Sequence, residues 1–261
     1  MLYLFLCASV FLCAYLLNIT YISVFYHRGL AHQSLTIKPW IKNFIVRTGP
    51  WITGIDPKGW VIMHRFHHRY SDTPLDPHSP VQVGFLGVAI KQLKYYERVL
   101  SGIKRQDPKI VAIGEDLQFP INWLNQKKVW VLPYVLHLLI AAFLGYKIGV
   151  ILGVCYYVGI MSHPIQGWMV NAFGHAVGYR NFNLPDNSRN NTLVAWLVLG
   201  EGYQNNHHRF PESPKFSFKW WEVDAGYLFC LLFKRLGLVD MQKPDTVADT
   251  SLTSLIQSEA P

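Results

Sequence analysis

Histidine is the residue type whose number and spacing in this sequence point most directly to chemistry. Eleven histidines are present, and eight of them fall into four short groups. The groups are HRGLAH (His27, His32), HRFHH (His64, His67, His68), NAFGH (Asn171, His175) and QNNHH (Gln204, His207, His208). Residues three and four apart share one face of a helix, so the side chains within each of the last three groups project together. The first pair is five apart, and we expect the helix to loosen near Gly29 to bring it into line.

This clustering predicts a metal centre. Burying several imidazoles near one another is costly unless they are neutral and coordinated. Neutral imidazole suits zinc, copper, iron and nickel, and eight histidines exceed the three or four ligands of one zinc site. The sequence therefore predicts two metal ions. We expect His137 and His163, which stand alone in apolar segments, to be satisfied core residues, and His78 to be structural in a loop.

Three uncharged stretches must position these groups. About half of the 261 residues are hydrophobic and 15% are charged, against about 25% charged in a typical soluble domain. The uncharged stretches are 1–27, 129–146 and 148–179, and the first is ample for a hydrocarbon core of about 30 Å. A cleaved signal peptide is disfavoured because no basic residue precedes this long run. We expect three transmembrane helices, the second and third forming a hairpin with Lys147 at its tip.

The distribution of positive charge predicts the orientation. Of the 24 lysines and arginines, 15 lie within residues 28–128 and 8 follow Tyr179, so Lys147 alone falls on the other side. The positive-inside rule then places the N-terminus outside and all four histidine groups on the cytoplasmic face of a bacterial inner membrane or an ER-like membrane.

The predicted fold class is an all-α integral membrane protein with about three transmembrane helices, interfacial helices and a cytoplasmic histidine-rich cap. Segments 38–60, 84–100 and 225–238 are expected at the membrane interface. Residues 1–239 form one domain, and 240–261 are expected to be a polar, partly disordered tail. The four cysteines stand in apolar stretches without a CxxC, which predicts neither a disulfide framework nor a thiolate site.

In combination, HRGLAH, HRFHHRYSDTPLDPHSP, NAFGH and GEGYQNNHHRFP resemble the membrane fatty acyl desaturases, closest to the stearoyl-CoA desaturase branch and its bacterial relatives. The likeness runs from about residue 20 to about residue 225. It implies O2 activation at two iron ions and insertion of a cis double bond, delta-9-like, into a saturated acyl chain. It implies one iron held by His27, His32, His64, His68 and His208, and a second held by His67, His175, His207 and, through water, Asn171. It also implies that Trp60 and Trp168 line a bent acyl tunnel, although interfacial anchoring of both indoles fits the sequence equally well.

Three departures from the family pattern stand out. Gln204 occupies the position where the third box usually begins with histidine, and its amide oxygen is a weaker, harder ligand; a QxxHH box does occur in some desaturase groups. Many relatives have two spans before the first box, where this chain has room for one. Ile62 and Met63 are apolar where acyl-CoA enzymes carry Arg-Asp, so the acyl carrier, coenzyme A or a lipid, stays open.

The expected partners are a fatty acyl-CoA or acyl-lipid, the membrane and an external electron donor. The sequence contains no CxxCH, iron–sulfur cysteine set or GxGxxG, so a ferredoxin or small cytochrome with its reductase must supply electrons. Candidates for holding an anionic head group are Arg28, Arg65, Arg69, Arg180 and Arg209, which could equally be ordinary surface charge at a membrane.

Three other classes of protein compete with this interpretation. A di-iron membrane fatty acyl or alkane hydroxylase would use the same scaffold. A non-catalytic metal-binding or transport protein is disfavoured because the spans contain no carboxylates, and a ferritin-like protein because no ExxH occurs. Nucleic-acid binding is not expected, since the basic residues follow the membrane topology.

Overall fold

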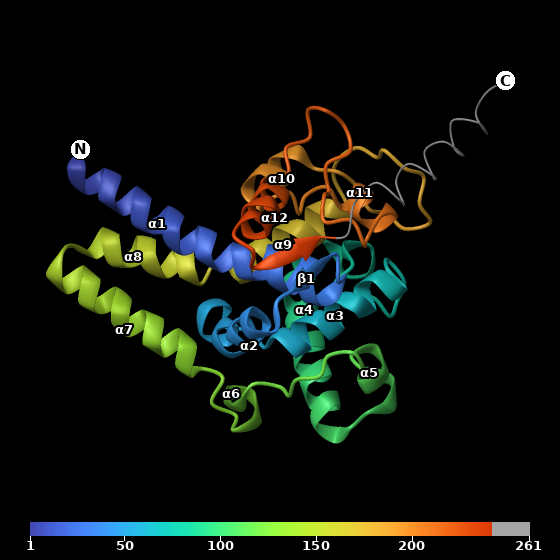
Figure 1. Ribbon diagram of the computed structural model, residues 1–261, viewed down its shortest axis with the longest axis horizontal. Coiled ribbons are helices and arrows are strands. Elements are labelled where there is room, and N and C mark those ends of the chain that lie inside the picture. The colour runs from blue at the N-terminus through green and yellow to red at the C-terminus, as the bar shows by residue number, and fades with distance from the viewer. Residues whose placement is uncertain (242–261) are drawn as a thin grey trace.

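The structure is a computed structural model that describes residues 1–241, and it is mostly helical, as expected (Figure 1). The elements are α1 (Leu2–Thr20), η1 (Tyr21–Ala31), β1 (Leu35–Ile37), α2 (Pro39–Thr53), α3 (Pro57–Tyr70), α4 (Pro80–Arg105), α5 (Pro108–Ile113), α6 (Trp123–Gln126), α7 (Leu132–Lys147), α8 (Val150–Ile160), α9 (His163–Gly174), α10 (Thr192–Leu197), α11 (Gln204–Arg209), α12 (Ala225–Arg235) and β2 (Val239–Met241). Apart from its first two residues, which belong to β2, the tail expected at 240–261 lies outside the described residues.

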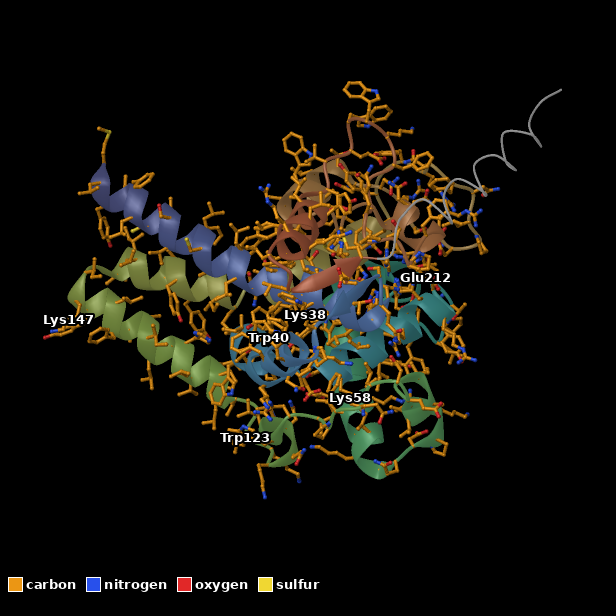
Figure 2. All side chains as sticks on the ribbon, in the orientation of Figure 1. Lys38, Trp40, Lys58, Trp123, Lys147 and Glu212 are labelled. Atoms are coloured by element: carbon orange, nitrogen blue, oxygen red, sulfur yellow. The ribbon has the colours of Figure 1, made fainter. Side chains whose placement is uncertain are left out.

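Helices α1, α7 and α8 project together from one side of the molecule (Figure 1). The expected hairpin is present: α7 and α8 pack against each other, and Lys147 stands at the tip (Figure 2). Glycine allows the close approach, because a Cβ on Gly153 would lie 2.2 Å from the carbonyl oxygen of Ala141. α8 in turn packs along α1, so the three helices form one apolar bundle.

Within residues 1–241, one continuous helical stretch, Leu2–Ala31, is long and apolar enough to cross a membrane. α7 and α8 are apolar but have 16 and 11 residues, about 24 Å and about 17 Å of helix. The third uncharged run, expected to form the third transmembrane helix, is divided at residues 161–162 into α8 and α9. Pro164 lies in the first turn of α9, where a proline is tolerated because that N–H has no helical partner. In the interior of one continuous helix the same proline would break the hydrogen bonding.

The remaining elements form a cap around η1 and α3. α3 begins after Asp56, whose side chain accepts hydrogen bonds from the backbone N–H groups of Lys58 and Gly59. α4 packs against both α3 and α9. A short antiparallel pairing of β1 with β2, with Leu35 opposite Met241, ties the end of the described chain to the segment after η1; nothing in the sequence pattern predicted it.

The segments predicted to be interfacial carry exposed apolar side chains. Trp40 and Phe44 are exposed on α2, Leu86 and Ile90 on α4, and Leu228 on α12. Trp40 lies near the junction of the helical bundle and the cap, whereas Glu212 lies on the far side of the cap from Lys147 (Figure 2). Exposed apolar side chains are thus found on the cap as well as on the bundle.

Candidate metal centre

The first histidine pair is positioned by a wide helical turn. η1 is a π-helix, and just beyond it the backbone N–H of His32 donates to the carbonyl oxygen of His27, five residues back, at 3.1 Å. This turn stacks residues five apart, and the two imidazole rings lie 4.9 Å apart. The predicted loosening near Gly29 is therefore confirmed. Such π-helical turns occur frequently at functional sites.

The eight grouped histidines meet in two adjoining clusters. The first cluster contains His27, His32, His64, His68 and His207, and the second contains His67, His175 and His208. Within each cluster the potential ligand nitrogens lie within 4.8 Å of one another. The clusters touch, since the rings of His68 and His208 are 4.5 Å apart. Residues from η1, α3, α11 and the end of α9 are brought together as the sequence predicted.

The division of the last two histidines between the clusters is the reverse of the expected one. His207 Nε2 lies 3.0 Å from both His27 Nε2 and His68 Nε2, so it belongs to the first cluster. His208 Nδ1 donates to Asp186 at 2.9 Å, which turns its Nε2 toward His67 Nε2 at 3.3 Å. Consecutive residues on a helix point about 100° apart, and the carboxylate of Asp186 decides which way the pair faces.

Four carboxylates orient the imidazoles from behind, and sequence reasoning missed all four. Each accepts a hydrogen bond from a histidine Nδ1: Glu201 from His27 at 2.5 Å, Asp76 from His67 at 3.0 Å, Asp72 from His175 at 2.9 Å and Asp186 from His208 at 2.9 Å. Metal-binding histidines usually have such a partner, which fixes the tautomer and ring direction. For Asp72, Asp76 and Glu201, their closeness in sequence to the boxes, as in YSDTPLD and GEGYQNNHH, was the available signal.

The electrostatics favour neutral imidazoles and ionised carboxylates. Burial, reinforced by neighbouring histidines, holds the pKa of His32, His64, His68 and His207 well below the usual value. Burial alone would raise the pKa of Asp72, but the hydrogen bond and charge of His175 bring it to about 2. The first cluster therefore presents lone pairs, and ionised carboxylates lie behind the histidines.

The arrangement of donors and acceptors fits bound cations. His67 and His208 each direct Nδ1 at a carboxylate, and their Nε2 atoms face each other across 3.3 Å. Burial lowers the pKa of His208 to about 4. Burial would also lower the pKa of His67, but the charge and hydrogen bond of Asp76 raise it. The Nε2 atom of His175 is buried without a hydrogen-bond partner among residues 1–241. The neutral ring of His208 and the unpartnered Nε2 of His175 are nitrogen donors of the kind that suits iron and its neighbours.

Gln204 and Asn171 are the other two residues predicted at the centre, and hydrogen bonds from their side-chain amides hold both in place. Gln204 is buried and its Nε2 donates to the carbonyl oxygen of Glu201 at 2.7 Å. Asn171 donates to Gln92 Oε1 at 3.2 Å. Both line the cavity that adjoins the clusters, so each faces the space in which a substrate or a water would lie.

This cavity has a volume of about 480 Å³ and reaches from the histidines into an apolar interior. Its walls include His27 and His64, Trp60, and residues of α1, α4 and α9. Trp60 stacks on His64 with ring centres 5.1 Å apart. Trp168, expected to line the same tunnel, is outside this lining: its Nε1 donates to the carbonyl oxygen of Phe85 at 3.0 Å and its ring packs on Phe85 and Phe173.

Arg28, a candidate for binding a head group, is instead fully buried. Its guanidinium donates to Glu201 at 2.8 Å and to Asp224 at 3.0 Å, and lies 3.7 Å from the centre of the Phe216 ring. A residue without exposed surface cannot meet a head group at the membrane. Arg28 instead connects the carboxylate behind His27 to the start of α12.

The three ungrouped histidines differ from one another. His137 is satisfied as predicted, by Tyr156 Oη and the carbonyl oxygen of Trp51, both at 2.7 Å. His78 is buried, its ring lies tilted 4.4 Å from that of His67, and neither of its nitrogens has a hydrogen-bond partner within the described chain. The expectation of a satisfied His163 is wrong, because its buried Nδ1 likewise lacks a partner among residues 1–241. Both His78 and His163 line the cavity.

Comparison with known proteins gives a consistent result. Residues 2–227 match the family described as Fatty acid desaturase. The chain is 34% identical over 217 residues to the sn-1 stearoyl-lipid 9-desaturase of Anabaena variabilis, covering 83% of this chain and 76% of that protein. It is 32% identical over 228 residues to acyl-CoA 5-desaturase AL21 of Anemone leveillei, covering 85% and 67%. It is also 32% identical over 240 residues to the hex-5-enoyl-[acyl-carrier protein] acetylenase of Moorena producens (strain JHB), covering 85% and 72%.

Proposed function

The chain belongs to the fatty acid desaturase family, and from that premise we propose that it is an O2-dependent acyl desaturase with a histidine-bound di-iron centre. It inserts a cis double bond, delta-9-like in position, into a saturated acyl chain. The observation that carries this proposal is the pair of adjoining histidine clusters at the wall of a mostly apolar cavity. Residues 1–239 are proposed as the desaturase domain.

In this proposal one iron is held by the five histidines of the first cluster and the other by the three of the second. Asn171, through a water, and Gln204 are proposed to complete the second site. When bound, the irons activate O2 and supply an oxidant able to remove hydrogen from an unactivated methylene, which acid–base side chains cannot do.

The protein's own contribution is to hold the ligands and the chain. Glu201, Asp72, Asp76 and Asp186 keep the Nδ1 protons in place, so that each of their histidines turns Nε2 toward the centre. The apolar walls exclude water and fix which methylene faces the clusters, because reaction requires the reacting atoms to be held in a near-attack geometry. Trp60, stacked on His64, forms the wall nearest the metals.

The proposed substrate is a fatty acyl-CoA or an acyl-lipid, with the carrier outside the cavity. The three relatives named above differ in carrier: a lipid, coenzyme A and acyl-carrier protein. Within residues 1–241 the cavity lining contains no lysine or arginine, and its acidic residues are Glu97 and Glu201, so the walls offer no cation for an anionic carrier. Electrons are proposed to come from a ferredoxin or a small cytochrome with its reductase.

The proposed location is integral to a bacterial inner membrane or an ER-like membrane, with the metal centre on the cytoplasmic face. Support comes from the apolar stretch Leu2–Ala31, from exposed Leu138, Leu139 and Phe143 on α7, and from Lys147 at the far tip of the hairpin (Figure 2). Cysteines introduced singly at positions 147 and 212 test the orientation: an impermeant thiol reagent should label the first from outside and the second only after permeabilisation.

The activity itself is tested by expressing the chain with a reductase and an electron carrier and mapping double bonds in the host lipids by mass spectrometry. We expect new monounsaturated chains that disappear when His64 is replaced by alanine. A folded, iron-loaded protein that forms no unsaturated product refutes the proposal. An oxygenated product would indicate the hydroxylase, and bound iron without any product would indicate a metal-binding protein.

A further inference from the structure

The cavity is closed around the metal centre and open on another side. The lining residues that come from η1, α3 and α11 are all buried. Within residues 1–241 the exposed lining residues come from three places, the middle of α4, the first turn of α9 and the segment before α7. They are Ala89, Leu93, Glu97, Trp130 and Pro164. These five residues form the rim of the opening.

The contacts between α4 and α9 place the opening. The ring centres of Phe85 and Phe173 are 4.6 Å apart, and Asn171 donates to Gln92 at 3.2 Å. The first half of α4 therefore packs on the second half of α9. The rim residues of α4 come next along the chain, and Pro164 lies at the opposite end of α9. The opening thus lies between the second half of α4 and the start of α9.

The surface of α4 outside the rim suits a lipid bilayer. Leu86, Ile90 and Leu93 share one stripe of the helix and are 78%, 62% and 59% exposed. Lys94 and Arg98, both exposed, lie on the adjacent face. An amphipathic helix with a basic polar face lies in the membrane interface with its apolar face toward the acyl chains. Because Leu93 belongs to both the stripe and the rim, the opening faces the hydrocarbon.

The other edge of the opening lies at the ends of the apolar bundle. Pro164 comes just after α8, and Trp130 comes just before α7. Trp123 and Trp130 are both exposed, and tryptophan is enriched where head groups meet acyl chains. In the proposed membrane location, the rim therefore lies at the depth from which a lipid acyl chain could bend into the cavity.

We propose that the cavity takes its acyl chain sideways from the bilayer through this rim, and that the substrate is a membrane glycerolipid. The head group stays at the interface while the chain passes between α4 and α9 toward the histidines. A chain that moves from hydrocarbon into an apolar cavity never exposes its apolar surface to water. Glu97 is the one charged residue of the rim, and like charges disfavour a carrier with several phosphates, such as coenzyme A.

This inference deepens the proposed function and location and rests on both. The full-length, iron-loaded protein is placed in nanodiscs of stearoyl-oleoyl phosphatidylglycerol with a reductase and an electron carrier. No acyltransferase is present, so chains cannot move between carriers. Stearoyl-CoA and stearoyl-[acyl-carrier protein], each added to nanodiscs of dioleoyl phosphatidylglycerol, are the other arms. We expect the lipid-bound chain to be desaturated at least about tenfold faster, because a bilayer lipid is held at the opening at an effective concentration of about a millimolar.

Ala89→Trp should narrow the opening, since Ala89 is exposed and lines the cavity. We expect turnover of the lipid-bound chain to fall several-fold with unchanged iron content. Ala8→Trp is the matched control, because it adds the same indole at an exposed position of α1 that is not part of the cavity lining. Equal loss in both variants, or no loss in Ala89→Trp, contradicts entry between α4 and α9.

Photo-crosslinking without reductant separates this inference from the proposed function. Phosphatidylglycerol with a diazirine at successive positions of one acyl chain should label Ile22 or Met63, which are buried and line the cavity, and Ala89→Trp should reduce this labelling. If labelling occurs but no double bond forms, the sideways entry is supported and only the desaturase proposal fails. An absence of label inside the cavity overturns the inference. Faster turnover of either soluble carrier also overturns it, while leaving desaturation itself intact.

Discussion

Replacing Glu201 by glutamine tests the link between the buried charges and the metal centre. The Glu201 carboxylate accepts from His27 Nδ1 at 2.5 Å, Ser23 Oγ at 2.5 Å and Arg28 Nη1 at 2.8 Å. Burial would raise its pKa, but His27 and Arg28 hold that pKa below the usual value, so the group is ionised at neutral pH. Glutamine has the same shape as glutamate but no charge. Its NH₂ group would face at least one of these three donors and could not accept its hydrogen bond.

Two effects of Glu201→Gln follow, and each has its own magnitude. Breaking a buried ion pair costs about 3–5 kcal/mol, and we expect about 3 kcal/mol because Arg28 keeps Asp224, at 3.0 and 3.2 Å. Loss of the carboxylate behind a histidine ligand lowers metal affinity about 10- to 100-fold. Iron retained by the purified protein against a graded chelator measures the second effect, and the unfolding midpoint in detergent measures the first.

Asp116→Asn is the control, because it removes an Arg–Asp contact of similar length at the surface. Arg65 lies 2.5 Å from Asp116, whose side chain is 39% exposed, so the change should cost no more than about 1 kcal/mol and leave iron binding unaltered. The reasoning is refuted if Glu201→Gln holds iron as tightly as the unmodified protein, or if both variants lose stability equally.

Three further outcomes are expected. Gln204→His should keep the iron content and Gln204→Ala should lower it, measured by elemental analysis; equal iron in all three forms would show that residue 204 is not a ligand. Gly153→Ala should lower the unfolding free energy by about 1–3 kcal/mol, since the new methyl would meet the Ala141 carbonyl, whereas Gly145→Ala, with 3.6 Å of clearance, should not; identical midpoints would contradict this. The metal-free protein should lose stability as pH falls from about 7 to 5, by up to about 1.4 kcal/mol per pH unit and proton. Four first-cluster imidazoles have folded pKa values below their unfolded value of about 6.5, so the unfolded chain binds more protons, and a flat pH profile of the unfolding midpoint would count against neutral imidazoles.

The grouping of the histidines was predictable because local geometry sets it. Residues three and four apart share a helical face whatever the rest of the chain does, and the five-residue spacing of His27 and His32 required the wide turn that η1 provides. The allocation of His207 and His208 was not predictable. It depends on Asp186, which comes from a loop and reaches α11 only through the tertiary fold.

The burial of Arg28 was also not predicted from the sequence, again because its partners reach it only through the tertiary fold. Arg28 follows an apolar run, so its position suggested a membrane surface, but its partners Glu201 and Asp224 lie more than 170 residues away in the sequence. Composition likewise identified the apolar runs but did not fix their helical lengths, because the break before α9 depends on a single proline, Pro164.

The contact between His27 and His207 joins residues 180 positions apart, and this has a consequence for how the protein matures. At about 5–20 residues per second, synthesis of that interval takes about 10–40 s. The histidines of η1 and α3 are therefore made long before His207 and His208, which complete the two clusters. In the proposed centre, the first cluster is complete only after residue 207 has been made, and a ribosome stalled before it would leave that cluster open.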